Sequence, residues 1–112
     1  MDLKIERGDI IVCALSGSYG KPRPALVIQS DLFNPTHASI TICPITTHLV
    51  EAHLFRLSLS VTKKNGLKKP SQCMVDKITT LPRDKIKQKI GVVTSNQLEE
   101  ISHAIRRWLN LE

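Results

Sequence analysis

Hydrophobic residues in the first half of the chain come in short runs that end at turn-forming residues. One run, Ile10 to Leu15, follows Gly8-Asp9 and leads into the Gly- and Ser-rich segment Ser16 to Gly20; a second run ends near Gln29, and a third covers Ser39 to Ile45. Apolar runs of about 4–8 residues between turn signals are typical of strands buried on both faces of a sheet. The pattern therefore predicts successive strands through this half of the chain.

The second half continues with strand patterns. The segment from His53 to Ser60, in which Leu57 and Leu59 alternate with Ser58 and Ser60, predicts a further strand. The next segment, Thr62 to Pro70, is rich in lysine and contains a glycine, so we expect a mobile loop there. A turn is expected from Leu81 to Asp84. The strands on either side of this turn run from Gln72 to Thr79 and from Lys85 to Val93.

The end of the chain has the period of a helix. Apolar residues recur at helical spacing, at Leu98, Ile101, Ile105, Trp108 and Leu109. Thr94, with Gln97 three residues later, matches the pattern of a capping box. We expect one amphipathic C-terminal helix whose apolar stripe, Trp108 included, packs on the core. No repeat or linker divides residues 1–112, so the sequence predicts a single, mainly β domain (α+β) closed by this helix.

The chain is strongly basic. Its net charge is +6 and its pI is near 9.5, because 16 Lys and Arg outnumber 10 Asp and Glu. Such an excess favours a polyanionic partner, nucleic acid first, although ordinary solvated lysines fit each cluster separately. In a strand, Lys85, Lys87 and Lys89 would line one face, opposite Ile86 and Ile90. Because aromatic residues make up only 4% of the chain, we expect binding through charge rather than base stacking.

Cysteine usage indicates a reducing compartment. Cys13, Cys43 and Cys73 are odd in number and far apart, and no apolar signal segment opens the chain, so a cytoplasmic protein is expected. Cys43, His48 and His53 match no standard zinc spacing. No apolar run reaches the roughly 18 residues of a membrane helix. We therefore expect no metal, no cofactor and no membrane association.

Arg23 is the first candidate for chemistry. Pro22 and Pro24 restrict the backbone on either side of it, so its guanidinium projects from a fixed base. A surface arginine that closes a turn explains this stretch equally well. If the strands around Arg23 and Thr46 are antiparallel neighbours, however, the guanidinium meets the Thr46-Thr47-His48 group. A guanidinium beside hydroxyls suits a phosphate, and RNA supplies its own 2′-OH as nucleophile.

Four segments, in this order, resemble the MazF/PemK toxins of bacterial toxin–antitoxin systems. They are Arg7-Gly8-Asp9-Ile10, Gly20 to Asp31 with Asn34, Pro44-Ile45-Thr46, and Met74 to Thr80. The resemblance implies a small SH3-like β-barrel of the CcdB/PemK type with a C-terminal helix. It also implies a homodimeric, metal-independent endoribonuclease that cuts single-stranded RNA at short sequences and leaves 2′,3′-cyclic phosphate and 5′-OH ends. An antitoxin partner follows, with operator DNA bound only through that antitoxin.

Carried over by position, the catalytic residues of the resemblance are Arg23 and Thr46. Arg23 would stabilise the phosphorane, and Thr46 would donate a hydrogen bond to the scissile phosphate. Other residues are expected to contact the substrate: Lys21, Thr47, His48, Lys63, Lys64, Lys68, Lys69 and Asp76. Whether His48 moves a proton or only contacts RNA is open, as is whether Asp76 touches RNA or holds its strand.

The chain departs from the family pattern at two places. Ser18-Tyr19-Gly20 stands where many members carry an acidic group, and Met74 stands where PemK-like members have a second arginine. Two alternatives from other classes remain: a CcdB-like gyrase inhibitor, which needs no catalytic residues, and a noncatalytic RNA-binding module. The first ends in Trp-Gly-Ile, whereas this chain ends Trp108 to Glu112 with a different sequence.

Overall fold

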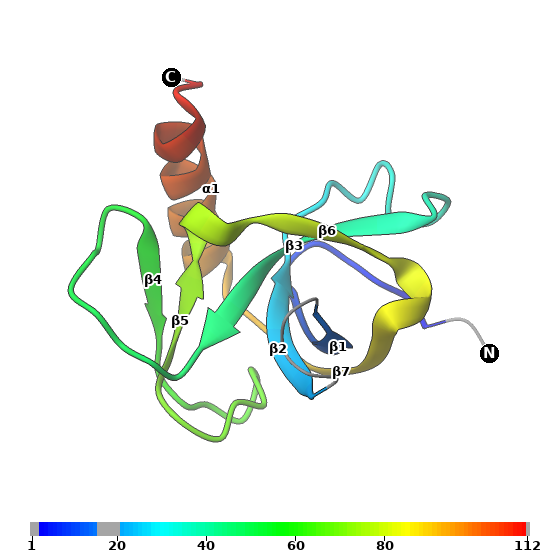
Figure 1. Cartoon of the computed structure of the whole chain (residues 1–112), viewed down its shortest axis with the longest axis horizontal. Coiled ribbons are helices and arrows are strands. Elements are labelled where there is room, and N and C mark those ends of the chain that lie inside the picture. The colour runs from blue at the N-terminus through cyan, green and yellow to red at the C-terminus, as the bar shows by residue number, and fades with distance from the viewer. Residues whose placement is uncertain (1–2, 16–20, 112) are drawn as a thin grey trace.

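A computed structural model describes residues 3–15 and 21–111 of the chain. Within these residues, strands come first and one α-helix closes the order (Figure 1). The strands are β1 (Asp9–Ala14), β2 (Pro22–Val27), β3 (Ser39–Thr46), β4 (Arg56–Leu59), β5 (Ser71–Met74), β6 (Thr79–Pro82) and β7 (Ile86–Val92). Two short 3₁₀ helices, η1 (Val75–Lys77) and η2 (Arg83–Lys85), flank β6, and the α-helix is α1 (Ser95–Leu109).

The strands form one mostly antiparallel sheet centred on β3. Its order is β4-β5-β3-β2-β1-β7, and β6 also pairs with β3. The sheet curls into a barrel-like layer that is not closed, with α1 against the side that carries β4 and β5 (Figure 1). This confirms the mainly β fold with a C-terminal helix.

The curled sheet is buried on both faces. Ile10, Leu26 and Cys43 belong to a core that α1 covers, while their chain neighbours Ile11 and Ala25 belong to a second core inside the curl. Successive residues of a strand point to opposite faces, so each strand contributes to both cores. This explains why β1, β2 and β3 appear in the sequence as continuous apolar runs.

The predicted strand from Gln72 to Thr79 is wrong, because it is two strands separated by η1. Cys73 pairs with Ile45 and Thr79 pairs with Ile42, so the five residues between Cys73 and Thr79 lie opposite only two residues of β3. The surplus forms the three-residue helix η1. The turn expected from Leu81 to Asp84 also begins later, since β6 runs through Pro82 before η2.

The lysines at the end of the sheet do not share one face as expected. The pairing of β7 with β1 shifts register twice, and Lys85 lies in η2 rather than in the strand. As a result Ile86 packs against the inner core and Ile90 against the core under α1. Lys89 turns to Asp9, with 3.0 Å between Nζ and Oδ1.

The segment Thr62 to Pro70 is anchored rather than mobile at its centre. Asn65 is buried, accepts hydrogen bonds from the amides of Thr62 and Leu67, and donates one to the carbonyl of Ser60 at 2.7 Å. Leu67 reaches into the core under α1. The prediction of a mobile loop missed these contacts, because turn-forming residues also satisfy one another within a fixed turn.

The helix begins as predicted and ends differently. Thr94 and Gln97 form the capping box, with 3.1 Å from the Gln97 amide to the Thr94 hydroxyl and 2.9 Å from the Thr94 amide to the Gln97 side chain. Trp108 was expected in the core, yet it is 49% exposed and meets Phe55 at a ring-centroid distance of 5.6 Å. The apolar stripe therefore extends beyond the core that it covers.

Asp31 links stability to pH. It accepts hydrogen bonds from the Arg7 amide at 2.7 Å and from the Asn34 side chain at 2.8 Å. The Arg7 bond, and then the Asn34 bond, lower the pKa of this carboxyl. Because the pKa is lower in the folded state, the carboxylate stabilises the fold above its unfolded pKa of about 3.9, and this contribution is lost as pH falls.

We expect Asp31→Asn to flatten the acid limb of the stability curve. The unfolding free energy of the wild type, measured by urea titration, should fall more steeply between about pH 5 and pH 3 than that of the variant. Asp84→Asn, at an exposed carboxyl, is the control and should keep the wild-type slope. Equal slopes for Asp31→Asn and the wild type would contradict this role of Asp31.

Candidate functional site

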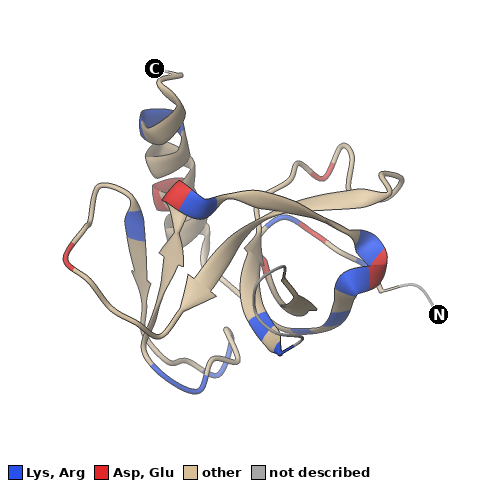
Figure 2. Cartoon of the chain, viewed as in Figure 1, with Lys and Arg blue, Asp and Glu red and all other residues tan. Residues whose placement is uncertain are grey.

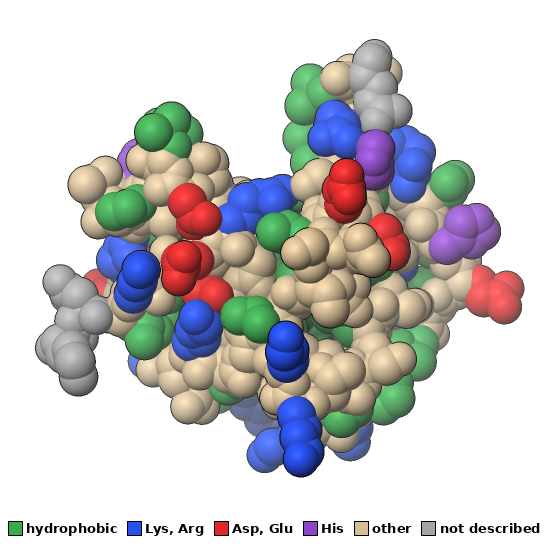
Figure 3. Space-filling model, turned by 180° about the vertical axis from the view of Figure 1, so that it is seen from behind, with side chains coloured by type: hydrophobic (Ala, Val, Ile, Leu, Met, Phe, Trp, Pro, Cys, Tyr) green, Lys and Arg blue, Asp and Glu red, His purple; other side chains and the backbone are tan. Residues whose placement is uncertain are grey.

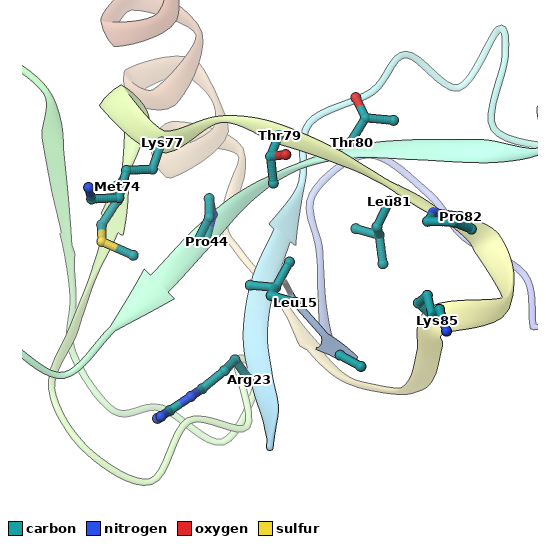
Figure 4. A pocket seen from close by; sticks show the side chains of 11 residues that line it. Leu15, Arg23, Pro44, Met74, Lys77, Thr79, Thr80, Leu81, Pro82 and Lys85 are labelled. Carbon is teal, nitrogen blue, oxygen red and sulfur yellow. The ribbon is translucent and has the colours of Figure 1, made fainter. Parts of the chain in front are cut away.

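Arg23 stands at the start of β2, where the sheet gives it a fixed backbone. It pairs with Cys13 of β1, and Pro22 and Pro24 lie on either side of it. Its side chain is exposed and has no hydrogen-bond or ion-pair partner among residues 3–15 and 21–111. Figure 4 shows the guanidinium extending from β2 toward the end of β3. The group is available to bind an anion.

Thr46 is the last residue of β3, the strand that pairs with β2. β2 and β3 are antiparallel, as the sequence hypothesis required, with Ala25 opposite Pro44. The paired residues end there; the same register continued by two residues would set Arg23 opposite Thr46. Residues two apart on a strand share a face, so both side chains lie on the face of Ala25 and Pro44.

The Thr46 hydroxyl is held in a turn that leaves its proton to donate. Its oxygen accepts a hydrogen bond from the His48 amide at 3.0 Å. Thr47 and His48 follow Thr46 as exposed residues. A hydroxyl can accept from the backbone and donate at the same time, so Thr46 can offer a hydrogen bond to a phosphate next to Arg23.

Two residues that the sequence did not single out position this turn. Gln72 pairs with Thr46 across β3 and β5; its Oε1 accepts from Val50 N at 3.1 Å and from Arg56 Nη1 at 2.9 Å. The Arg56 Nη1 also donates to the His48 carbonyl at 3.2 Å. The only sequence signal was a glutamine in an apolar strand, since a buried amide needs hydrogen-bond partners.

A cavity of about 770 Å³ opens beside Arg23 (Figure 4). Its lining comes from the end of β1, the start of β2, Pro44 of β3, the end of β5 and the η1-β6-η2 segment. The described lining residues are Ala14, Leu15, Arg23, Pro44, Met74, Lys77, Thr79, Thr80, Leu81, Pro82 and Lys85. The sequence analysis had proposed only Arg23 among these, because the others lie together through the pairing of β6 with β3.

Asp76 lies in η1 but does not line this cavity, although Met74 and Lys77 do. One of its carboxylate oxygens is buried without a hydrogen-bond partner among the described residues. It raises the pKa of Cys43, after the larger effects of the hydrogen bond with Cys73 and of burial. Asp76 therefore faces the protein interior, which favours the structural interpretation.

The other predicted residues provide charge. Lys63, Lys64, Lys68 and Lys69 are exposed on the loop between β4 and β5, and Lys21 precedes β2. Figure 2 places the cations of this loop and of the start of β2 at the lower end of the molecule, and Figure 3 shows lysine and arginine side chains gathered there from behind. A polyanion at Arg23 thus meets a positive surface.

Metal ligands are not gathered at this site. In the part of the chain that the structure describes, no three His, Cys, Asp or Glu side chains are placed to hold a metal ion. Cys43 is fully buried in β3, and burial together with the Cys73 hydrogen bond keeps its thiol protonated.

The comparison with protein-family models shows the family to which the chain belongs. Residues 6–109 match the family model described as PemK-like, MazF-like toxin of type II toxin–antitoxin system. The chain belongs to this family. A probable endoribonuclease MazF of Mycolicibacterium smegmatis is 38% identical over 108 residues, which are 96% of this chain and 98% of that protein. The CcdB-like interpretation loses its support, because the matched family is that of the MazF toxins.

Solved structures agree with this MazF-type fold. The Mycobacterium tuberculosis toxin MazF-mt6 superimposes with a TM-score of 0.81 at 24% identity, over 93% of this chain and 98% of its own. An endoribonuclease in complex with its cognate antitoxin, from a mycobacterial species, gives a TM-score of 0.78 at 21% identity, over 97% and 96%.

Proposed function

We propose that this MazF-type toxin endoribonuclease cleaves single-stranded RNA at short specific sequences, without a metal ion, by attack of the substrate's own 2′-OH. One observation supports the proposal: β2 and β3 pair antiparallel with Ala25 opposite Pro44, a register that, continued by two residues, would set the Arg23 guanidinium, unpartnered among the described residues, opposite the Thr46 hydroxyl. A cation and a hydroxyl donor on one face are what a pentacoordinate phosphate needs.

The reaction exchanges two phosphorus–oxygen bonds. The 2′-oxygen bonds to phosphorus and loses its proton to solvent or to a base, while the bond to the 5′-oxygen breaks and that oxygen takes up a proton. The products are a 2′,3′-cyclic phosphate and a 5′-OH. Arg23 stabilises the charge on the equatorial oxygens; a guanidinium has only N–H donors and no acceptor site, so it is not the base. Thr46 donates to one of the same oxygens.

Removing the Thr46 hydroxyl is expected to lower kcat/KM about 10- to 100-fold, because a hydrogen bond to a charged group contributes about 1.5–3 kcal/mol. Thr46→Val tests this in a cleavage assay. Thr46→Ser retains the hydroxyl and should recover most of the activity, and Thr36→Val, on an exposed turn, is the control. Wild-type rates in Thr46→Val would remove Thr46 from the mechanism.

Further contacts are proposed for the basic surface and for the partners. The loop lysines, Lys21, Thr47 and His48 would hold the RNA on either side of the cut. An antitoxin with an acidic segment would cover the same positive surface and would carry the toxin to operator DNA.

The apolar side chains of Trp108 and Leu111, at and just after the end of α1, are exposed and favour burial in a homodimer. In the described part, no helix is long and apolar enough to span a membrane. We propose action in the cytoplasm, a reducing compartment that suits the three free cysteines.

The test is a cleavage reaction on a long, weakly structured RNA in EDTA, with the new ends mapped. Cuts at a recurring short sequence, with cyclic phosphate and 5′-OH ends, support the proposal. RNA that is shifted on a gel but stays intact would instead indicate a noncatalytic RNA-binding module. RNA that is neither bound nor cut would contradict both the proposed cleavage and the RNA-binding interpretation.

A further inference from the structure

The cavity beside Arg23 has an apolar floor and a cationic rim. Ala14, Leu15 and Leu81 give it apolar walls, and the side chains of Arg23, Lys77 and Lys85 line it at separate places (Figure 4). None of the described residues that line it is acidic. Its volume of about 770 Å³ falls within the roughly 300–1,000 Å³ typical of small-molecule sites.

The two lysines are placed by the tertiary structure at opposite ends of β6. Lys77 ends η1 just before the strand, and Lys85 ends η2 just after it. Both are exposed, and neither has an ion-pair or hydrogen-bond partner in the described parts of the chain. Lys89, by contrast, is paired with Asp9. The rim therefore keeps two uncompensated charges besides Arg23.

The hydroxyls of β6 differ in their availability. Thr80 pairs with Thr41, and the two hydroxyl oxygens are 3.1 Å apart, whereas Thr79 pairs with Ile42 of the inner core face and its hydroxyl has no described partner. In Figure 4 Thr79 is on the cavity side and the Thr80 hydroxyl points away. The cavity thus offers one polar group beside an apolar floor.

We propose that this cavity binds the nucleotide next to the scissile phosphate, with its base on the apolar floor and its flanking phosphates on Lys77 and Lys85. This inference rests on the proposed function and adds two substrate-binding residues and a base subsite to it. A ring-shaped base fits an apolar floor with one hydroxyl, and a phosphodiester backbone fits separated cations that have no acid beside them.

The experiment measures cleavage and binding of an RNA oligonucleotide that carries the mapped cleavage sequence, over a series of salt concentrations. Binding uses the same oligonucleotide with a 2′-deoxy residue at the cut, or a mixed-sequence single strand if no cut is found. Lys77→Ala and Lys85→Ala are compared with Lys87→Ala, which removes the same charge two residues away, outside this cavity.

Each cavity variant should weaken binding and raise KM about fivefold at about 0.1 M salt, and should reduce the salt slope by about 0.7, as for one lost contact to single-stranded RNA. The kcat should stay at the wild-type value, because the contact is made equally in substrate and transition state. Lys87→Ala should change KM less than either. An abasic residue next to the cut should weaken binding to the wild type.

Three results would overturn the subsite: cavity variants that behave like Lys87→Ala, a fall in kcat without a change in KM, or full affinity for the abasic probe. Binding without cleavage by the wild type separates the two proposals. In that case the proposed function fails, while weaker binding by Lys77→Ala and Lys85→Ala still supports the cavity as an RNA-binding site. Absence of any RNA binding overturns both.

Discussion

Arg23→Ala is expected to lower RNA cleavage by roughly 10²–10³-fold, the usual loss when one preorganised donor to a developing oxyanion is removed. The side chain has no partner among the described residues, so its removal should leave the unfolding free energy within about 0.5 kcal/mol of the wild type. The measurement is a cleavage time course on an oligonucleotide, with urea unfolding of the same preparations. Unchanged cleavage in Arg23→Ala would reject the proposed active site.

Two further variants show whether charge or geometry matters at this position. Arg23→Lys retains the charge without the planar fork, so we expect partial activity between those of alanine and arginine. Arg106→Ala removes one positive charge from the last turn of α1, outside the lining of the cavity beside Arg23, and should cleave at the wild-type rate. A loss of activity in Arg106→Ala as large as in Arg23→Ala would indicate a general effect of charge.

Gly91→Ala is expected to destabilise the fold strongly. A β-carbon at this position would overlap the carbonyl oxygen of Lys64 and the backbone of Asn65. These atoms cannot move easily, because Val92 N donates to the Lys64 carbonyl at 2.8 Å and the Asn65 side chain is fixed by its own hydrogen bonds. Overpacking of this kind costs about 1–3 kcal/mol.

The change should lower the thermal midpoint by roughly 4–8 °C for each kcal/mol lost. Because the strained segment carries the loop lysines, RNA affinity should fall with it. Gln88→Ala, at an exposed position of the same strand, is the control and should melt with the wild type. A Gly91→Ala protein as stable as Gln88→Ala would show that the loop is not held against β7.

Local patterns in the sequence determined the elements whose signals lie within a few residues. The apolar runs predicted β1, β2 and β3, and the Thr94 and Gln97 pair predicted the start of α1. Capping and burial depend on neighbours in the chain, so spacing alone reveals them. The same is true of Arg23, because the prolines on either side of it mark its fixed backbone.

The other features of the fold and the site depended on tertiary structure, because they arise where strands far apart in the sequence pair with one another. β3 pairs with β5 and with β6 along one edge, and this breaks the predicted strand at η1. The bulges of β7 turn Lys89 to Asp9, and the contacts of Asn65 fix a segment whose composition predicted mobility. The cavity with Lys77 and Lys85 depends on these long-range pairings. The sequence by itself could therefore name Arg23 and Thr46 as candidates. The residues that lie beside them were decided by the folded sheet, through the register of β2 and β3 and the path of β6.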